Sequence, residues 1–276
     1  MRLAFYTYSY TDRLQLPIPL CLERIARTGF SGIDVSGSHG NSEDPRSFDA
    51  ARRRLTREMA EKFRLRVEAV VTHAELTSTL FDPKRKPLDL AGTVELAANI
   101  GADVVTFHMG GTPEGISQDL VWKRTVTAIR AAADNGARRH VRLAVDGIWP
   151  TWIDDSPDAL AQLFEDVDNP NFGVNFDPSY LTLMGVDVLE FAKRFAKQIV
   201  HGHFKDHRGT YPKWTHLIPG RGAMDYRHVF AALAAAGFDG AVASECFTSM
   251  KFPEACDGSY RALSAAAQQA GVTLGR

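Results

Sequence analysis

Short apolar runs and amphipathic helical segments alternate along the whole chain, and this alternation restricts the fold more than any other feature. Eight such pairs divide the 276 residues into units of about 34 residues. The pattern predicts strands at residues 3–8, 32–36, 66–73, 103–108, 142–146, 172–177, 199–204 and 240–245. It predicts helices at residues 17–28, 48–63, 88–100, 122–135, after 156, 186–195, 226–236 and 259–270. We therefore expect an α/β protein, a (β/α)8 TIM barrel in which residues 1–276 form a single domain.

The doubly wound α/β sheet is the alternative to the barrel. That fold normally carries a glycine-rich phosphate-binding turn after its first strand. Here the corresponding segment reads Tyr6-Thr7-Tyr8-Ser9-Tyr10 and contains no glycine. The sequence therefore favours the barrel.

Four consecutive strands in the second half of the chain end in polar, chemically active residues: Asp146, Asp177, His203 and Glu245. Active sites of such barrels lie at the carboxyl ends of the strands, so the four side chains are expected to face one pocket. Three carboxylates and one imidazole suit Mn2+, Mg2+, Co2+ or Zn2+, and a divalent cation would relieve their mutual repulsion. Each residue also has a structural alternative, such as a turn at Asp177-Pro178 or a core histidine at His203.

Composition and charge exclude several other classes of protein. The formal net charge is −1, so no overall field attracts nucleic acid or an anionic membrane. No apolar run reaches the roughly 18 residues of a membrane helix. The three cysteines, Cys21, Cys246 and Cys256, form no CxxC pair, and the N-terminus has no signal-peptide pattern. We expect a cytoplasmic protein. The sequence leaves open whether it forms a homo-oligomer or binds a partner subunit.

Four segments carry a resemblance to a known family: residues 169–178, 199–206, 219–225 and 237–245. They read NPNFGVNFDP, IVHGHFKD, PGRGAMD and GFDGAVASE. The chain resembles the sugar phosphate isomerase/epimerase family with a xylose isomerase-like TIM barrel, a superfamily that also includes endonuclease IV and several dehydratases.

This resemblance implies one divalent metal ion, Mn2+ as the first expectation, held by Asp146, Asp177, His203 and Glu245. It also implies that Glu245 and Asp146 are the catalytic proton-transfer residues, with Glu245 the better candidate. In members that isomerise or epimerise sugars, two carboxylates move protons on either side of the substrate carbon while the metal polarises the adjacent oxygens.

Two departures from the family pattern bear on the reaction. The family usually has Glu where this chain has Asp146, and a carboxylate that is shorter by one methylene changes the catalytic geometry. The residue three positions after Asp177 is often His, and here it is Tyr180, which either hydrogen-bonds the substrate or packs. Because Asp146 stands where the family usually has Glu, a lyase reaction is kept as an alternative to isomerisation.

The other candidate substrate-binding residues are His73, His108, Lys205, Trp149 and Trp214. In the endonuclease IV branch, histidines at the ends of strands three and four help hold extra metal ions. The rest of that cluster is not evident here, so we interpret His73 and His108 as substrate-contacting or structural. Lys205 is expected to contact substrate oxygens or to pair with Asp206.

Aromatic residues are expected at the rim of the pocket, where they suit the apolar faces of a sugar or cyclitol. Beside Trp149 and Trp214, the candidates are Tyr6, Tyr8, Trp152 and Phe247. The long segment 207–221 is expected to form a lid over strand seven.

These patterns predict a metal-dependent isomerase or epimerase of a sugar, keto-sugar or related polyol, acting by proton abstraction next to a carbonyl. The first alternative is a lyase on the same scaffold: an inosose or dehydroshikimate type of dehydratase, or an enzyme that cleaves C-glycosides. The second is a non-catalytic sugar-binding or partner subunit. A nuclease acting on abasic DNA ranks last, because the chain lacks the basic surface that DNA requires.

Overall fold

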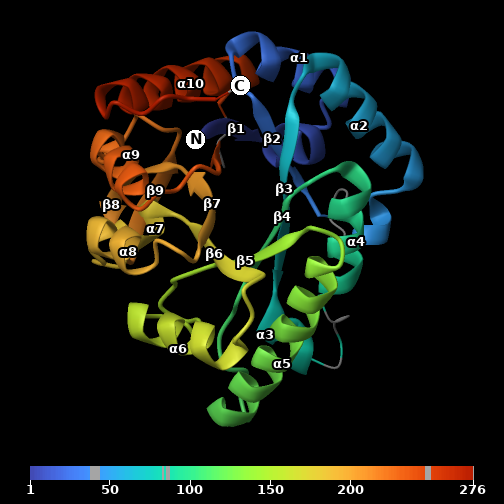
Figure 1. The fold of residues 1–276 in the computed structure, drawn as a ribbon, viewed down its shortest axis with the longest axis vertical. Helices are drawn as coiled ribbons and strands as arrows, with labels where there is room; N and C mark the ends of the chain where they lie inside the picture. Colours follow the sequence, from blue (N-terminus) through green and yellow to red (C-terminus); the bar gives the residue numbers. More distant parts are fainter. Residues whose placement is uncertain (38–43, 83, 85–87, 246–249, 276) are drawn as a thin grey trace.

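Eight parallel strands close into a barrel in the computed structural model, which describes residues 1–37, 44–82, 84, 88–245 and 250–275 (Figure 1). Their spatial order is β1-β10-β7-β6-β5-β4-β3-β2, so β1 pairs with both β2 and β10. The barrel strands are β1 (Arg2–Tyr6), β2 (Gly32–Ser36), β3 (Arg66–Glu75), β4 (Val104–His108), β5 (Arg142–Asp146), β6 (Phe172–Phe176), β7 (Ile199–Phe204) and β10 (Ala241–Ser244). The predicted TIM barrel is confirmed.

Helices surround the barrel and cover the outer face of the strands (Figure 1). They are α1 (Ile18–Thr28), α2 (Ala50–Phe63), α4 (Leu90–Ile100), α5 (Gln118–Ala137), α6 (Pro157–Val167), α8 (Val188–Arg194), α9 (Tyr226–Ala235) and α10 (Phe252–Gln269). Two short helices, α3 (Leu76–Phe81) and α7 (Pro178–Leu183), follow β3 and β6, and π and 3-10 turns occupy Ser9–Arg13 and Pro45–Ser47. Ser156 caps α6: its hydroxyl accepts a hydrogen bond from the N–H of Ala159 at 3.2 Å.

The predicted and observed boundaries coincide at β2, β5 and β7 and differ elsewhere by a few residues. The largest difference is at α10, which begins at Phe252 and not at Ser259. Gly258 stands just before the predicted start of this helix, but in the structure it lies inside the helix. A Cβ atom there would stand 2.8 Å from Ile218 Cδ1, so the glycine serves close packing and does not end the helix.

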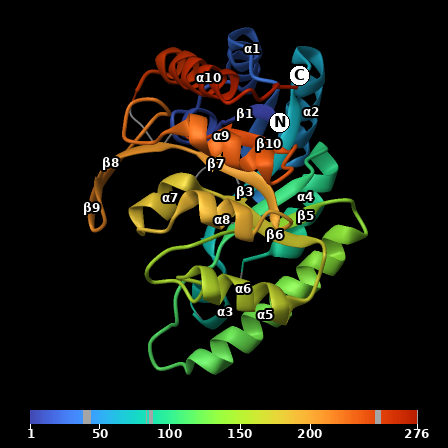
Figure 2. The same ribbon diagram turned by 60° about the vertical axis from the view of Figure 1, so that its left-hand side comes forward.

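The segment after β7 forms an antiparallel hairpin of β8 (Asp206–Thr210) and β9 (Lys213–Leu217), which projects outward from the barrel (Figure 2). The hairpin and the loop behind it are tied together by the carboxylate of Asp206. That carboxylate accepts hydrogen bonds from the backbone N–H groups of Gly220 at 3.1 Å and Met224 at 3.0 Å. The predicted lid segment is therefore an ordered hairpin, and its closure over a ligand stays a prediction.

The barrel strands are buried on both faces, as is usual for a parallel sheet covered by helices. The two ends of the described chain meet, because the N–H of Gly275 donates to the carbonyl of Met1 at 2.8 Å. Cys21 and Cys256 are free, buried thiols, and Cys246 lies outside the described residues. Within the part of the chain that the structure describes, no helix has the length and hydropathy to cross a bilayer.

Candidate active site

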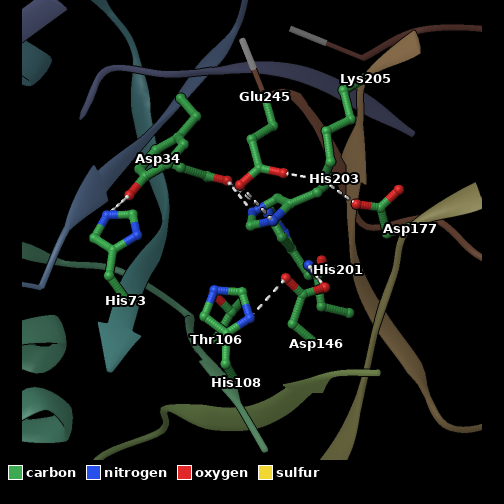
Figure 3. A network of polar contacts seen from close by, with 12 residues as sticks. Asp34, His73, Thr106, His108, Asp146, Asp177, His201, His203, Lys205 and Glu245 are labelled. Carbon is green, nitrogen blue, oxygen red and sulfur yellow. Dashed lines mark hydrogen bonds and ion pairs between the residues drawn. The ribbon is translucent and has the colours of Figure 1, made fainter. Parts of the chain in front are cut away.

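The structure brings the four predicted metal ligands together at the carboxyl ends of adjacent strands (Figure 3). Asp146 is the last residue of β5, Asp177 caps α7 directly after β6, His203 lies in β7, and Glu245 follows β10. All four side chains are at most 3% exposed. Parallel strand order explains this convergence, because residues distant in sequence reach the same end of the barrel.

Lys205 lies among these carboxylates. Its ammonium group forms ion pairs with Asp177 Oδ2 and Glu245 Oε2, and Nζ stands 4.0 Å from the centre of the Tyr180 ring. Burial alone would lower the pKa of Lys205, but Asp177 and Glu245 outweigh it and hold that pKa well above its ordinary value. The sequence offered two roles for Lys205. Asp206, the second predicted partner, turns instead toward the backbone of the hairpin.

The imidazole of His203 is held on one side by Asp34, a residue of β2 to which sequence reasoning assigned no role. Asp34 Oδ2 lies 3.2 Å from His203 Nε2 and 2.8 Å from His201 Nε2. Burial opposes ionisation of Asp34, but His201 and then His203 outweigh it and lower the pKa of Asp34 to about 2. The only available signal was an acidic residue inside the apolar run Gly32–Ser36.

The other ring nitrogen of His203 faces the carboxylate cluster. His203 Nδ1 is 3.6 Å from Glu245 Oε1 and has no hydrogen-bond partner among the described residues. A carboxylate on one imidazole nitrogen fixes which nitrogen is presented to a ligand. Asp34 therefore orients Nδ1 toward the pocket.

Asp146 has surroundings different from those of Glu245. The amide of Asn175 donates to Asp146 Oδ1 at 3.0 Å, and His108 Nδ1 lies 3.4 Å from Oδ2. Burial raises the pKa of Asp146 to about 7, even though His203 and Lys205 act in the opposite direction. Burial, and after it the proximity of His73, lowers the pKa of His108 to about 3, so His108 is a neutral imidazole near neutral pH.

His73 lies on the opposite side of the pocket. Its Nε2 is 2.7 Å from the hydroxyl of Tyr6, and its ring centre is 4.2 Å from that of Tyr8. Tyr6 in turn stacks on His203 with ring centres 6.0 Å apart. Thus His73 contacts the site through Tyr6, and its predicted contact with substrate stays a prediction.

Aromatic rings form one wall of the site. They come from the loop after β5, from α7 and from the β8–β9 hairpin. The ring centre of Trp149 is 5.2 Å from that of Trp214, 5.0 Å from that of Tyr180 and 5.9 Å from that of Tyr211. Trp152 instead lies near His108, with ring centres 5.4 Å apart. We call Trp149, Tyr180, Tyr211 and Trp214 the aromatic wall. Phe247 lies outside the described residues.

Two groups of donor atoms are candidates for holding a divalent cation. Within the described ranges, Asp34, His201 and His203 alone bring three ligand atoms within 4.8 Å of one another. The second group joins the unpartnered Nδ1 of His203 to the carboxylates of Asp146, Asp177 and Glu245, whose ligand atoms do not meet that distance. Oxygen and imidazole donors suit hard and borderline divalent metals. This end of the barrel is therefore a candidate divalent-metal site.

The sequence model of the xylose isomerase-like TIM barrel family matches residues 22–270 of this chain. The chain belongs to that family, and the resemblance carried by the strand-end motifs is confirmed. The family contains proteins of several activities, so membership fixes the scaffold and the end of the barrel at which chemistry is expected.

Curated relatives and solved structures share this scaffold at low identity. An uncharacterized protein of Mycobacterium bovis is 26% identical over 242 residues, which are 81% of this chain and 81% of that protein. An inosose dehydratase of Lacticaseibacillus casei is 23% identical over 137 residues, or 44% of this chain and 46% of the relative.

Among the solved structures, a D-tagatose 3-epimerase-like protein superimposes with a TM-score of 0.80 at 16% identity, covering 98% of both chains. The IolI protein with a bound zinc atom superimposes with a TM-score of 0.75 at 18% identity, again over 98% of both chains. At these identities the solved structures establish the fold alone.

Proposed function

We propose that this protein is a divalent-metal-dependent isomerase or epimerase of a sugar, keto-sugar or related polyol. The observation that carries the proposal is the convergence of Asp146, Asp177, His203 and Glu245 at the carboxyl ends of four adjacent strands. The two candidate proton-transfer groups also differ in their surroundings. Burial raises the pKa of Asp146 to about 7. Burial would also raise the pKa of Glu245, but Lys205 and His203 outweigh it and lower that pKa to about 2. While Lys205 is paired with Glu245, the two carboxyl groups therefore differ in proton affinity, which supports different roles for them in proton transfer.

In the proposed reaction, Glu245 is the base that removes the proton next to the substrate carbonyl. Asp146 reaches the same space from β5 and returns a proton to the carbon or oxygen on the other side (Figure 3). Asn175 and His108 hold the Asp146 carboxyl group in place. Such positioned acid–base groups typically accelerate proton transfer by about 10²–10⁴-fold.

Asp146, Asp177, His203 Nδ1 and Glu245 would hold the cation, which when bound would polarise the carbonyl and hydroxyl oxygens beside the reacting carbon. We prefer this grouping to Asp34, His201 and His203, because it lies at the open ends of the strands, where substrate enters such barrels. In this assignment Asp34 is the group that orients His203. Mn2+ is our first expectation for the metal, with Mg2+, Co2+ and Zn2+ as alternatives.

The remaining predicted residues would form the substrate-binding surface. The aromatic wall offers flat apolar faces to a sugar or cyclitol ring. His108, neutral and beside Asp146, would hydrogen-bond a substrate hydroxyl. These assignments support a small-molecule substrate of the polyol class.

A lyase is the second candidate, and the identity of Asp146 favours it. In a lyase Asp146 would act as the acid and not as a metal ligand, because a carboxyl group with a pKa of about 7 can keep a proton and donate it to a departing hydroxyl group. The sequence similarity to an inosose dehydratase points in the same direction. Both reactions begin with the same proton abstraction by Glu245 and diverge at the next step.

The test is solvent exchange. The wild-type protein with Mn2+ is incubated in D2O with a panel of keto-sugars and inososes, and deuterium incorporation is followed by NMR and product mass. For an isomerase we expect deuterium incorporation without loss of water, so that the product mass rises only by the deuterium taken up. For a dehydratase we expect loss of water. Glu245→Gln should reduce exchange by about 10²–10⁴-fold, whereas Glu190→Gln, an exposed matched control on α8, should leave it unchanged. Full exchange by Glu245→Gln would contradict the proposal.

A further inference from the structure

The ammonium group of Lys205 occupies the space between two of the four proposed metal ligands. It pairs with Asp177 Oδ2 and with Glu245 Oε2, and the Lys205 side chain is only 1% exposed (Figure 3). Asp177 and Glu245 are separated by 68 positions in sequence and contribute from different strands. One internal ammonium group thus pairs with two buried carboxylates.

A divalent cation bound to the same oxygens would stand next to this ammonium group. Two cations at contact distance in a buried pocket repel strongly, because little solvent screens them. Conversely, two buried carboxylates that lose the ammonium group between them repel each other, and a buried charge without a partner is strongly unfavourable. The pocket therefore favours one cation between Asp177 and Glu245 at a time.

We propose that Lys205 is an internal counter-ion that competes with the divalent metal for Asp177 and Glu245, so that metal binding displaces its ammonium group. This inference rests on the proposed metal site. It assigns Lys205 two positions: between the carboxylates without the metal, and released toward the substrate space with it. The second position is the one in which Lys205 can contact substrate oxygens.

The backbone around Lys205 is fixed, which confines the exchange to its side chain. The Tyr226 hydroxyl donates to the carbonyl of Lys205 at 2.6 Å, and Asp206 is anchored to the hairpin by three backbone N–H groups. The Tyr180 ring lies 4.0 Å from Nζ and makes a cation–π contact with the ammonium group in its paired position. A flexible four-carbon stem on a fixed backbone suits such a displacement.

The test compares Mn2+ affinities by isothermal titration calorimetry. Lys205→Met removes the competing charge and should bind Mn2+ at least about tenfold more tightly than the wild type. Lys213→Met, an exposed lysine on β9, makes the same chemical change and should leave the affinity unchanged. Equal or weaker Mn2+ binding by Lys205→Met would overturn the inference.

A second measurement uses the wild-type protein, in case Lys205→Met folds poorly without metal. The 15N NMR signal of the Lys205 ammonium group should shift when Zn2+ is added, as its ion pairs with Asp177 and Glu245 are broken. A signal that is unchanged at saturating Zn2+ would overturn the inference.

The outcomes separate this inference from the proposed function. Strong and equal Mn2+ binding by wild type and Lys205→Met would overturn the competition and leave the proposed function standing. Binding by Lys205→Met alone would support Lys205 as the occupant of the cation position and overturn metal dependence in the natural protein. Failure of both proteins to bind Mn2+ or Zn2+ would overturn both.

Discussion

Asp154, in the loop between β5 and α6, is expected to make the stability of this protein decrease as the pH rises. Its side chain is fully buried, and neither carboxyl oxygen has a hydrogen-bond partner among the described residues. Burial, with smaller contributions from Asp146 and Asp155, raises the pKa of Asp154 from 3.8 to about 7. Between these two pKa values, Asp154 therefore keeps its proton in the folded protein, whereas in the unfolded chain it has already released it.

The magnitude follows from the separation of these two pKa values. Each pKa unit corresponds to about 1.4 kcal/mol, so full ionisation of Asp154 costs about 4 kcal/mol of unfolding free energy. A raised pKa means that this contribution to stability is present below the unfolded pKa of 3.8 and is lost as the pH rises through about 7. Between pH 5 and pH 8 the expected loss is about 2–3 kcal/mol.

Urea denaturation at pH 5 and pH 8 measures this loss. Asp154→Asn removes the titrating group, so its unfolding free energy should fall less than that of the wild type between the two pH values. Asp155→Asn, an exposed neighbour, should keep most of the wild-type pH dependence, because Asp155 makes only a small contribution to the raised pKa of Asp154. Other titrating groups affect all three proteins alike, so the difference isolates Asp154. An identical pH dependence for the wild type and Asp154→Asn would refute the reasoning.

Two further predictions concern the site. Asp34→Asn should weaken Mn2+ binding by about 10–100-fold, because Asp34 orients His203, whereas His201→Gln should keep the affinity within about threefold. Calorimetric titration checks both, and loss of Mn2+ binding by His201→Gln would instead place the cation between Asp34 and the two histidines. Trp149→Ala should raise KM about tenfold with little change in kcat, because in the proposed function the aromatic wall would bind the substrate and not the transition state alone. Steady-state kinetics measures this, and a loss confined to kcat would contradict it.

The parts of this fold that the sequence predicted are those set by local pattern. The runs ending in Asp146 and His203 show both the strand and the polar residue that closes it, and barrel topology then brings these ends together. By contrast, the sequence predicted the last helix from Ser259, whereas α10 begins at Phe252 and includes Gly258 beside Ile218, a contact that no local pattern reveals.

Contacts between distant residues account for what the sequence did not predict. Asp34 meets His201 across 167 positions, and Lys205 meets Glu245 across 40. Only the closed barrel brings these side chains within hydrogen-bonding distance. The β8–β9 hairpin has no clear alternation of apolar and polar residues, and its order depends on the carboxylate of Asp206. Such contacts are decided by tertiary packing and not by propensity.

The aromatic wall also gives the protein a built-in optical reporter. Trp149 and Trp214 have ring centres 5.2 Å apart at an interplanar angle of 67°, close enough for their electronic transitions to couple. Tyr180 links this pair to the Lys205 ammonium group. A ligand that enters between the wall and the carboxylates would change the near-ultraviolet circular dichroism of the pair. Ligand occupancy of the site can thus be followed by near-ultraviolet circular dichroism, without an activity assay.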